Sequence, residues 1–184
     1  MIRLIIDTSH KFLAVGVVDG HKILAQRQDM LSKQQSEYLI TYIQEVIGDA
    51  KIEKSDIKEI ILTDGPGSYT GLRIAMTFAK VFSLTNSIKI YTVNTLLSVS
   101  GLDQGFVLLD ARGKRVFGAY VDKGQVIDEK VYQLDELELG DVKLFGDASL
   151  VDGEDNYGNI IQNILDVEAF WNEVKNIDVL TPRY

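Results

Sequence analysis

Two aspartates stand where apolar strands are expected to end. Asp7 follows the apolar run at 2–6, and Asp110 follows a second run at 106–109. Carboxylates in such positions can hold a magnesium ion or orient a water molecule for phosphoryl transfer. An aspartate can equally cap a turn by hydrogen-bonding the main chain two residues on. The residues alone leave both roles open for Asp7 and Asp110.

A glycine-rich segment at 64–73 is the second candidate for chemistry. Gly65 and Gly67 flank Pro66, which predicts a sharp turn after an apolar strand at 56–63. Ser68 and Thr70 can each cap the helix predicted at 72–84. A glycine turn that opens a helix can bind a phosphate through free N–H groups.

The spacing of the third glycine argues against the two common phosphate motifs. Gly71 is followed by Leu72 and Arg73, where a P-loop carries Lys and Ser or Thr. The same glycine falls one residue late for a dinucleotide fingerprint. We therefore interpret Gly65, Pro66, Gly67, Ser68, Thr70 and Gly71 as a structural motif.

Other catalytic and metal-binding groups are scarce. The chain has no cysteine, and its two histidines, His10 and His21, both fall in predicted turns. The acidic loop at 152–158 is unlike a calcium loop, because its twelfth position is Asn163 instead of a glutamate. We predict no catalytic residue, no peptidase chemistry and no metal site.

Composition narrows the partners. The 184 residues carry a net charge of −8, with a sequence pI of about 4.8, so no broad basic surface for RNA is expected. The start of the chain does not resemble a signal peptide, and no apolar run approaches the length of a membrane span. We therefore expect a cytoplasmic protein with no membrane contact.

The first half is expected to be a mixed α/β unit. Strands are predicted at 2–6, 12–18, 22–28, 56–63 and 88–93, and helices at 32–48 and 72–84. This order combines an antiparallel meander with parallel crossover units. Ser32 is the expected N-cap of the first helix, with Gln35 completing a capping box. A short helix at 95–100 leads to a boundary near 101–105.

The second half repeats the beginning of the first. Asp7 and Asp110, Lys11 and Lys114, and Asp19 and Asp122 are each 103 residues apart. Strands are expected at 106–109, 116–121, 125–132 and 142–145, and a helix at 159–174. We interpret this pattern as an internal duplication with a reduced second copy, dividing the chain into 1–100 and 101–184.

The 72–84 helix is apolar over more than half of its circumference, more than an ordinary surface helix requires. It is either buried within one domain or covered by a second protein, and the pattern does not say which side would face a partner. Two tyrosines one turn apart on the 32–48 helix are either interface anchors or a cover for the domain's own core. The candidate partner-interface residues are Tyr38, Tyr42, Arg73, Met76, Thr77 and Lys80.

Residues 65–75 read Gly-Pro-Gly-Ser-Tyr-Thr-Gly-Leu-Arg-Ile-Ala, which resembles the signature of the TsaB (YeaZ) family. The duplicated pattern also resembles the actin-like ATPase (ASKHA, ribonuclease H-like) fold, an α/β fold of two βββαβαβ units. In that superfamily two aspartate turns face each other across a nucleotide cleft. The resemblance implies that Asp7 and Asp110 are remnants of such a cleft. It is strongest over 1–121 and weak from 134 onward.

The resemblance implies a non-catalytic partner of TsaD, which forms N6-threonylcarbamoyladenosine in tRNAs that read ANN codons. TsaD would transfer the threonylcarbamoyl group from threonylcarbamoyl-AMP, and the ATPase TsaE would join the assembly. This chain would need no cofactor of its own, with ATP or ADP and a metal only in complex with TsaD and TsaE. Because the chain is acidic, we expect it to contact tRNA only indirectly, and we expect its apolar helix face to form a homodimer when the chain is isolated.

The alternative is an autonomous actin-fold ATPase or a small-molecule kinase. Such an enzyme needs an adenosine pocket in its second half, for which only the segment 146–148 is available.

Overall fold

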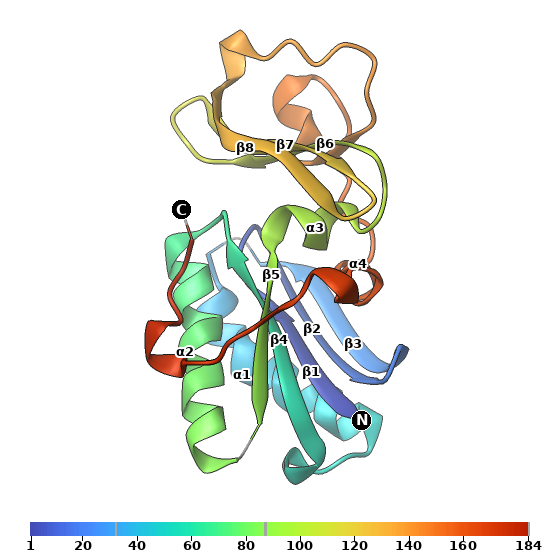
Figure 1. The fold of residues 1–184 in the computed structure, drawn as a ribbon, viewed down its shortest axis with the longest axis vertical. Helices are drawn as coiled ribbons and strands as arrows, with labels where there is room; N and C mark the ends of the chain where they lie inside the picture. The colour runs from blue at the N-terminus through green and yellow to red at the C-terminus, as the bar shows by residue number, and fades with distance from the viewer. Residues whose placement is uncertain (32, 87, 184) are drawn as a thin grey trace.

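A computed structural model describes residues 1–31, 33–86 and 88–183. Two sheets stand one above the other along the long axis of the molecule (Figure 1). The first has the strand order β10-β5-β4-β1-β2-β3, and the second has the order β8-β7-β6-β9. The first sheet comprises β1 (Ile2–Asp7), β2 (Phe12–Asp19), β3 (Lys22–Met30), β4 (Ile57–Gly65), β5 (Lys89–Asn94) and β10 (Asn172–Glu173). The second comprises β6 (Gly105–Asp110), β7 (Arg115–Asp122), β8 (Gln125–Gln133) and β9 (Leu144–Gly146).

Two long helices cover one face of the first sheet. They are α1 (Gln35–Ala50), against β2 and β3, and α2 (Tyr69–Thr85), against β1, β4 and β5. Successive strand residues point to opposite faces, so Leu4 and Ile6 on β1 join the core beneath these helices. Ile5 points to the other face and joins a different core.

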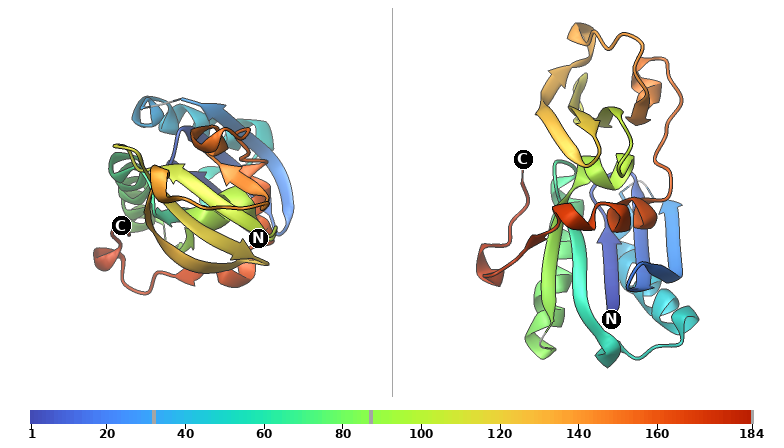
Figure 2. Two further views of the ribbon diagram at one scale, coloured as in Figure 1. Left: turned by 90° about the horizontal axis from the view of Figure 1, so that it is seen from above. Right: turned by 45° about the vertical axis from the view of Figure 1, so that its right-hand side comes forward.

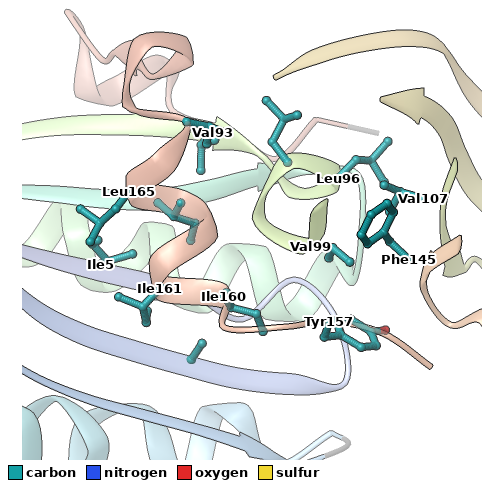
Figure 3. Packing of buried hydrophobic residues seen from close by; sticks show 14 of the residues in the cluster. Ile5, Val93, Leu96, Val99, Val107, Phe145, Tyr157, Ile160, Ile161 and Leu165 are labelled. Carbon is teal, nitrogen blue, oxygen red and sulfur yellow. The ribbon is translucent and has the colours of Figure 1, made fainter. Parts of the chain in front are cut away.

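Two short helices contribute to this second core. They are α3 (Thr95–Ser100), which packs against strands of both sheets, and α4 (Ile160–Asp166), which packs against α3 and against β1, β2 and β3. Figure 3 shows side chains from both sheets and both helices meeting in one cluster, with Ile5, Val107 and Ile161 among them. This shared core contains residues of both sheets. The two further views show how the sheets are arranged relative to each other (Figure 2).

The outer face of the second sheet is covered differently. Phe106, Leu108 and Val116 on that face pack against apolar residues of the stretch at 134–151, and no long helix follows β8 within residues 134–183. The duplication predicted from the sequence is confirmed, with a second copy that lacks counterparts of α1 and α2 among the described residues. The two hairpins also differ by one residue, since Asp7 pairs with Ala14 while Asp110 pairs with Val116.

The helix predicted at 159–174 is wrong beyond Asp166. The indole nitrogen of Trp171 donates to the carbonyl of Ile164 at 3.0 Å, and the chain then extends so that Asn172 pairs with Thr92 on β5. Residues 172–173 therefore form an edge strand on β5, where the apolar periodicity had predicted the last turn of the helix. Residues of the predicted second unit, 101–184, thereby complete the first sheet.

The chain then returns along α2 towards the upper end of that helix (Figure 1). Helix α1 begins at Gln35, and the predicted N-cap Ser32 lies outside the described residues. Helix α2 begins at Tyr69, three residues earlier than the sequence suggested.

Candidate functional site

Asp7 is a fully buried carboxylate that joins three elements. One oxygen accepts hydrogen bonds from the main-chain N–H of Ser9 at 2.9 Å and the hydroxyl of Thr63 at 3.0 Å. The other accepts from the hydroxyl of Ser98 on α3 at 2.6 Å. Burial raises the pKa of Asp7, but the nearby His10 and the donors of Ser9 and Ser98 outweigh it and hold the pKa below its usual value.

His10 faces the same carboxylate from the turn after β1. Its Nε2 lies 3.2 Å from Oδ2 of Asp7, while its Nδ1 accepts a hydrogen bond from the N–H of Phe12 at 3.2 Å. In the neutral ring this arrangement places the proton on Nε2, towards Asp7. The ring also packs against Tyr157, with centroids 4.8 Å apart. Asp7 and His10 therefore form a buried structural pair.

The glycine motif packs directly onto the Asp7 turn. A Cβ at Gly67 would lie 2.3 Å from the carbonyl oxygen of Ser9, and one at Gly71 would lie 1.9 Å from that of Thr8. The hydroxyl of Thr8 donates to the carbonyl of Gly71 at 2.7 Å. These glycines are needed for close backbone approach.

Ser68 is the N-cap of α2, because its hydroxyl accepts from the N–H of Gly71 at 3.3 Å. Thr70 lies in the first turn of the helix and is not the cap. The motif thus positions the start of α2 against β1.

Asp110 occupies the equivalent turn of the second sheet but lies at the surface. Its carboxylate accepts from the N–H of Arg112 at 2.7 Å, which repeats the bond from Ser9 to Asp7. Its own N–H donates to the carboxylate of Asp147 at 2.9 Å. Asp110 lines a cleft between the two sheets, whereas Asp7 is not among the residues that line it. The structure does not bring the two carboxylates into one site.

The cleft has a volume of about 620 Å³ and is crossed by an ion pair. The ammonium of Lys11 lies 2.7 Å from Asp147 and also contacts Asp155. Burial lowers the pKa of Lys11, but hydrogen bonds to Asp147 and Asp155 reverse the effect and raise it above its usual value. The hydroxyl of Tyr157 donates to Asp147 at 2.8 Å. The ammonium of Lys11 and the carboxylates of Asp147 and Asp155 therefore bind one another, while Lys33, Arg112 and Asp110 also line the cleft.

No group of three or more possible metal ligands occurs in the described part of the chain. Within the same ranges, no helix is long and apolar enough to cross a membrane.

The predicted interface residues lie on two opposite flanks of the helix pair. The hydroxyl of Tyr42 on α1 donates to Asp29 on β3 at 2.8 Å, and Tyr38 packs beside it. On α2, the predicted residues Arg73, Thr77 and Lys80 face residues 180–182 across a groove of about 370 Å³. Tyr42 lies on the side of α1 that faces β3, and α2 packs on the other side of α1, over β1, β4 and β5. The tyrosines of α1 and the predicted residues of α2 therefore do not share a surface.

Met76 differs from the other predicted interface residues. It is only 2% exposed and lies in the core with Leu180. In the folded chain it is therefore not on the surface.

A seam between α1 and α2 carries apolar side chains that are not among the predicted interface residues. At about 100° per residue, Ile40 lies on the side of α1 opposite Tyr42, which is the side of α2. Ile74, Phe78 and Val81 are spaced at i, i+4 and i+7, away from the flank with Lys80. Ile40 is 49% exposed and Val81 is 59% exposed. Helical spacing alone could have identified this set, but not its exposure.

Comparison with known proteins places the chain in a family. The model of the family described as "TsaD: tRNA N6-adenosine threonylcarbamoyltransferase" matches residues 25–138. The Bacillus subtilis protein named "tRNA threonylcarbamoyladenosine biosynthesis protein TsaB" is 28% identical over 137 residues, which are 71% of this chain and 60% of that protein. A protein of the same name from Buchnera aphidicola is 32% identical over 95 residues, covering 52% of this chain and 45% of its own length. The chain thus matches less than two thirds of the length of either relative.

Two solved structures share the whole fold. YeaZ from Pseudomonas aeruginosa has a TM-score of 0.75 at 16% identity, covering 100% of this chain and 99% of that one. A second Pseudomonas aeruginosa structure, described as similar to peptidase YEAZ, has a TM-score of 0.80 at 16% identity, covering 100% and 98%. The fold class inferred from the sequence is confirmed. The chain belongs to the TsaB (YeaZ) family.

Proposed function

We propose that this chain is a non-catalytic partner subunit of TsaD in the formation of N6-threonylcarbamoyladenosine in tRNA. The names of its relatives support a place in this modification. TsaD would carry out the transfer from threonylcarbamoyl-AMP on tRNAs that read ANN codons, and TsaE would complete the assembly in the cytoplasm.

The observation that carries the proposal is the exposed seam of the α1–α2 pair. Ile40 and Val81 are large apolar residues about half exposed, on two helices that already cover their own sheet. An apolar surface of this kind favours a protein partner. Because this apolar surface lies on two neighbouring helices, a partner that also supplies a pair of helices can pack its side-chain ridges into the grooves of α1 and α2. The same seam would support a homodimer when TsaD is absent.

Two features support a role without catalysis. Asp7 is buried and does not line the cleft, and Lys11 in the cleft is bound to Asp147 and Asp155. With a net charge of −8, the chain also repels a phosphate backbone, so tRNA would be held by another subunit.

The test is size-exclusion chromatography with light scattering, of the chain mixed with TsaD from the same organism. Val81→Glu places a charge on the seam without disturbing the core, because Val81 is already 59% exposed. Ile127→Glu, at a similarly exposed apolar residue on β8, is the matched control. We expect wild type and Ile127→Glu to form a mixed complex and Val81→Glu to lose it. Equal complex formation by Val81→Glu would exclude the seam as the docking surface.

The rival function, an autonomous ATPase or small-molecule kinase, has one feature in its favour. The cleft of about 620 Å³ reaches Ser68, Tyr69 and Thr70 at the start of α2, where a helix dipole favours anions. This rival would be supported over the partner role if the isolated chain hydrolysed magnesium–ATP with saturable kinetics. A variant with an altered cleft should then lose this hydrolysis.

A further inference from the structure

The last residues of the described chain, 177–183, form a strap beside α2 (Figure 1). The strap follows β10 and makes no strand pairing of its own. It is held at both ends. Ile177 and Leu180 pack on the core that contains Met76, and Arg183 reaches the glycine turn before α2.

Arg183 forms the polar anchor. Its N–H donates to the carbonyl of Asp64 at 2.7 Å, and its guanidinium donates to the carbonyl of Gly65 at 3.0 Å. The guanidinium also reaches Glu129 on β8 at 3.2 Å, so the strap touches both sheets. A Cβ at Gly65 would lie 2.1 Å from the carbonyl oxygen of Arg183, and Gly65 has a φ of +123°. The first glycine of the motif is thus shaped to receive the strap.

Between its two anchors the strap stands away from α2. The groove of about 370 Å³ has Met76 and Leu180 as its apolar lining, with Thr181 and Pro182 opposite α2. Val179, just before Leu180, is 69% exposed. A segment with few buried contacts and no ladder of hydrogen bonds is among the first parts of a protein to open locally.

The flank of α2 that lines the groove is cationic. Arg73 and Lys80 are two turns apart, about 10 Å along the helix axis, and both line the groove. Neither forms an ion pair with any residue in the described ranges. In a chain with a net charge of −8, such a flank attracts an acidic segment while the rest of the surface repels it.

We propose that the flank of α2 beneath the strap is a docking surface for an acidic segment of the partner subunit. The strap is its removable cover. Carboxylates of the segment would meet Arg73 and Lys80, and one apolar side chain would take the place of Leu180 against Met76. This inference rests on the proposed function and adds a second contact to the α1–α2 seam.

The chain has no cysteine, which permits a clean test. Thr77→Cys with Thr181→Cys puts one thiol on α2 and one on the strap, across the same groove. Oxidation ties the strap down and reduction frees it in the same protein. We expect the oxidised form to bind TsaD at least tenfold more weakly than the reduced form, with reduction restoring binding. Equal affinity in the two states would overturn the proposal.

A second variant covers the case in which the disulfide does not close. Arg183→Gln removes the charged anchor and leaves the core unchanged. We expect faster amide hydrogen exchange at Leu180 and Arg183, whose N–H groups donate to Ile177 and Asp64, and several-fold tighter binding of TsaD. Lys130→Gln, at an exposed ion pair on β8, is the control and should alter neither.

The charge of the docked segment is tested by Arg73→Glu with Lys80→Glu, which should weaken TsaD binding at least tenfold. If this double variant binds TsaD as tightly as wild type, the proposal of an acidic docked segment is wrong. The proposal is also wrong if the double variant keeps its affinity for TsaD but loses affinity for an RNA oligonucleotide that wild type binds. If wild type does not bind TsaD at all, the proposed function fails. Amide hydrogen exchange in Arg183→Gln then tests, without TsaD, whether the strap can open. Unchanged exchange would show that the strap is a fixed part of the fold.

Discussion

The turns at Asp7 and Asp110 end the first strand of each sheet, and each carboxylate accepts a hydrogen bond from the N–H two residues on. Around Asp7, further bonds come from Thr63 and Ser98, and the start of α2 packs over the turn. Around Asp110, the side chain faces the cleft and solvent. One local conformation therefore serves as a buried junction in one copy and as a surface turn in the other.

The difference follows from what each copy places above its turn. The first copy has α2 and its glycine motif, and the second has no such helix in the described chain. A duplicated residue keeps its main-chain bond because that bond is local. Its burial and partners depend on elements that only one copy retains.

The largest expected effect is the loss of the buried junction. Asp7→Ala removes the buried acceptor that the hydroxyls of Ser9, Thr63 and Ser98 share, and should lower the free energy of unfolding by about 3–5 kcal/mol. Asp110→Ala loses one exposed turn bond and should cost about 1 kcal/mol or less. Urea denaturation of both variants measures the two values. Similar losses would mean that the two turns are equally structural.

The next effect concerns the packing over the Asp7 turn. Gly71→Ala would place a methyl group 1.9 Å from the carbonyl oxygen of Thr8, and should destabilise the fold by about 3 kcal/mol. At Gly113→Ala, in the Asp110 turn, the added methyl would only make ordinary contacts with the Arg115 side chain at 3.9 Å, and φ is +62°, so the change should cost only about 1 kcal/mol. Thermal unfolding compares the two. A tolerated Gly71→Ala would contradict the close approach of α2.

Acid should remove the contribution of Asp7. Its pKa in the folded chain is held below its usual value, which is about 3.9 when unfolded. Its contribution is therefore complete above that pH and is lost as the pH falls towards the folded-state pKa. Each unit of pKa depression contributes about 1.4 kcal/mol. The gap in unfolding free energy between wild type and Asp7→Asn should narrow between pH 5 and pH 2.5, and a constant gap would contradict an ionised Asp7.

The smallest effect compares the lysines that follow the two turns. Lys11 joins the sheets through Asp147 and Asp155, whereas Lys114 has no ion pair with any described residue. Because Lys11 is partly exposed, Lys11→Gln should cost about 1 kcal/mol, and Lys114→Gln only a few tenths. Chemical denaturation at low and high salt resolves the difference. An equal cost for both would remove Lys11 as a link across the cleft.

Much of the fold was predictable because its signals are local. The strands near 2–6, 12–18 and 106–109 have continuous apolar runs, and α1 has helical spacing, so their positions are confirmed. The end of the 159–174 helix was not predictable, because Trp171 and Asn172 take their conformation from contacts with α4 and β5. The interface residues remain predictions, and the structure separates Tyr38 and Tyr42 from the α2 set.

By itself, the sequence determined the α/β class, the duplication, the paired aspartate turns and the family signature, all of which depend on residue types at short spacing. Only the tertiary structure decided that Asp7 is buried, that Lys11 crosses the cleft and that a strap covers Met76. These features join residues from 56 to more than 130 positions apart. Helical and strand periodicities give the direction of a side chain, but burial and charge pairing depend on which distant segment packs against it.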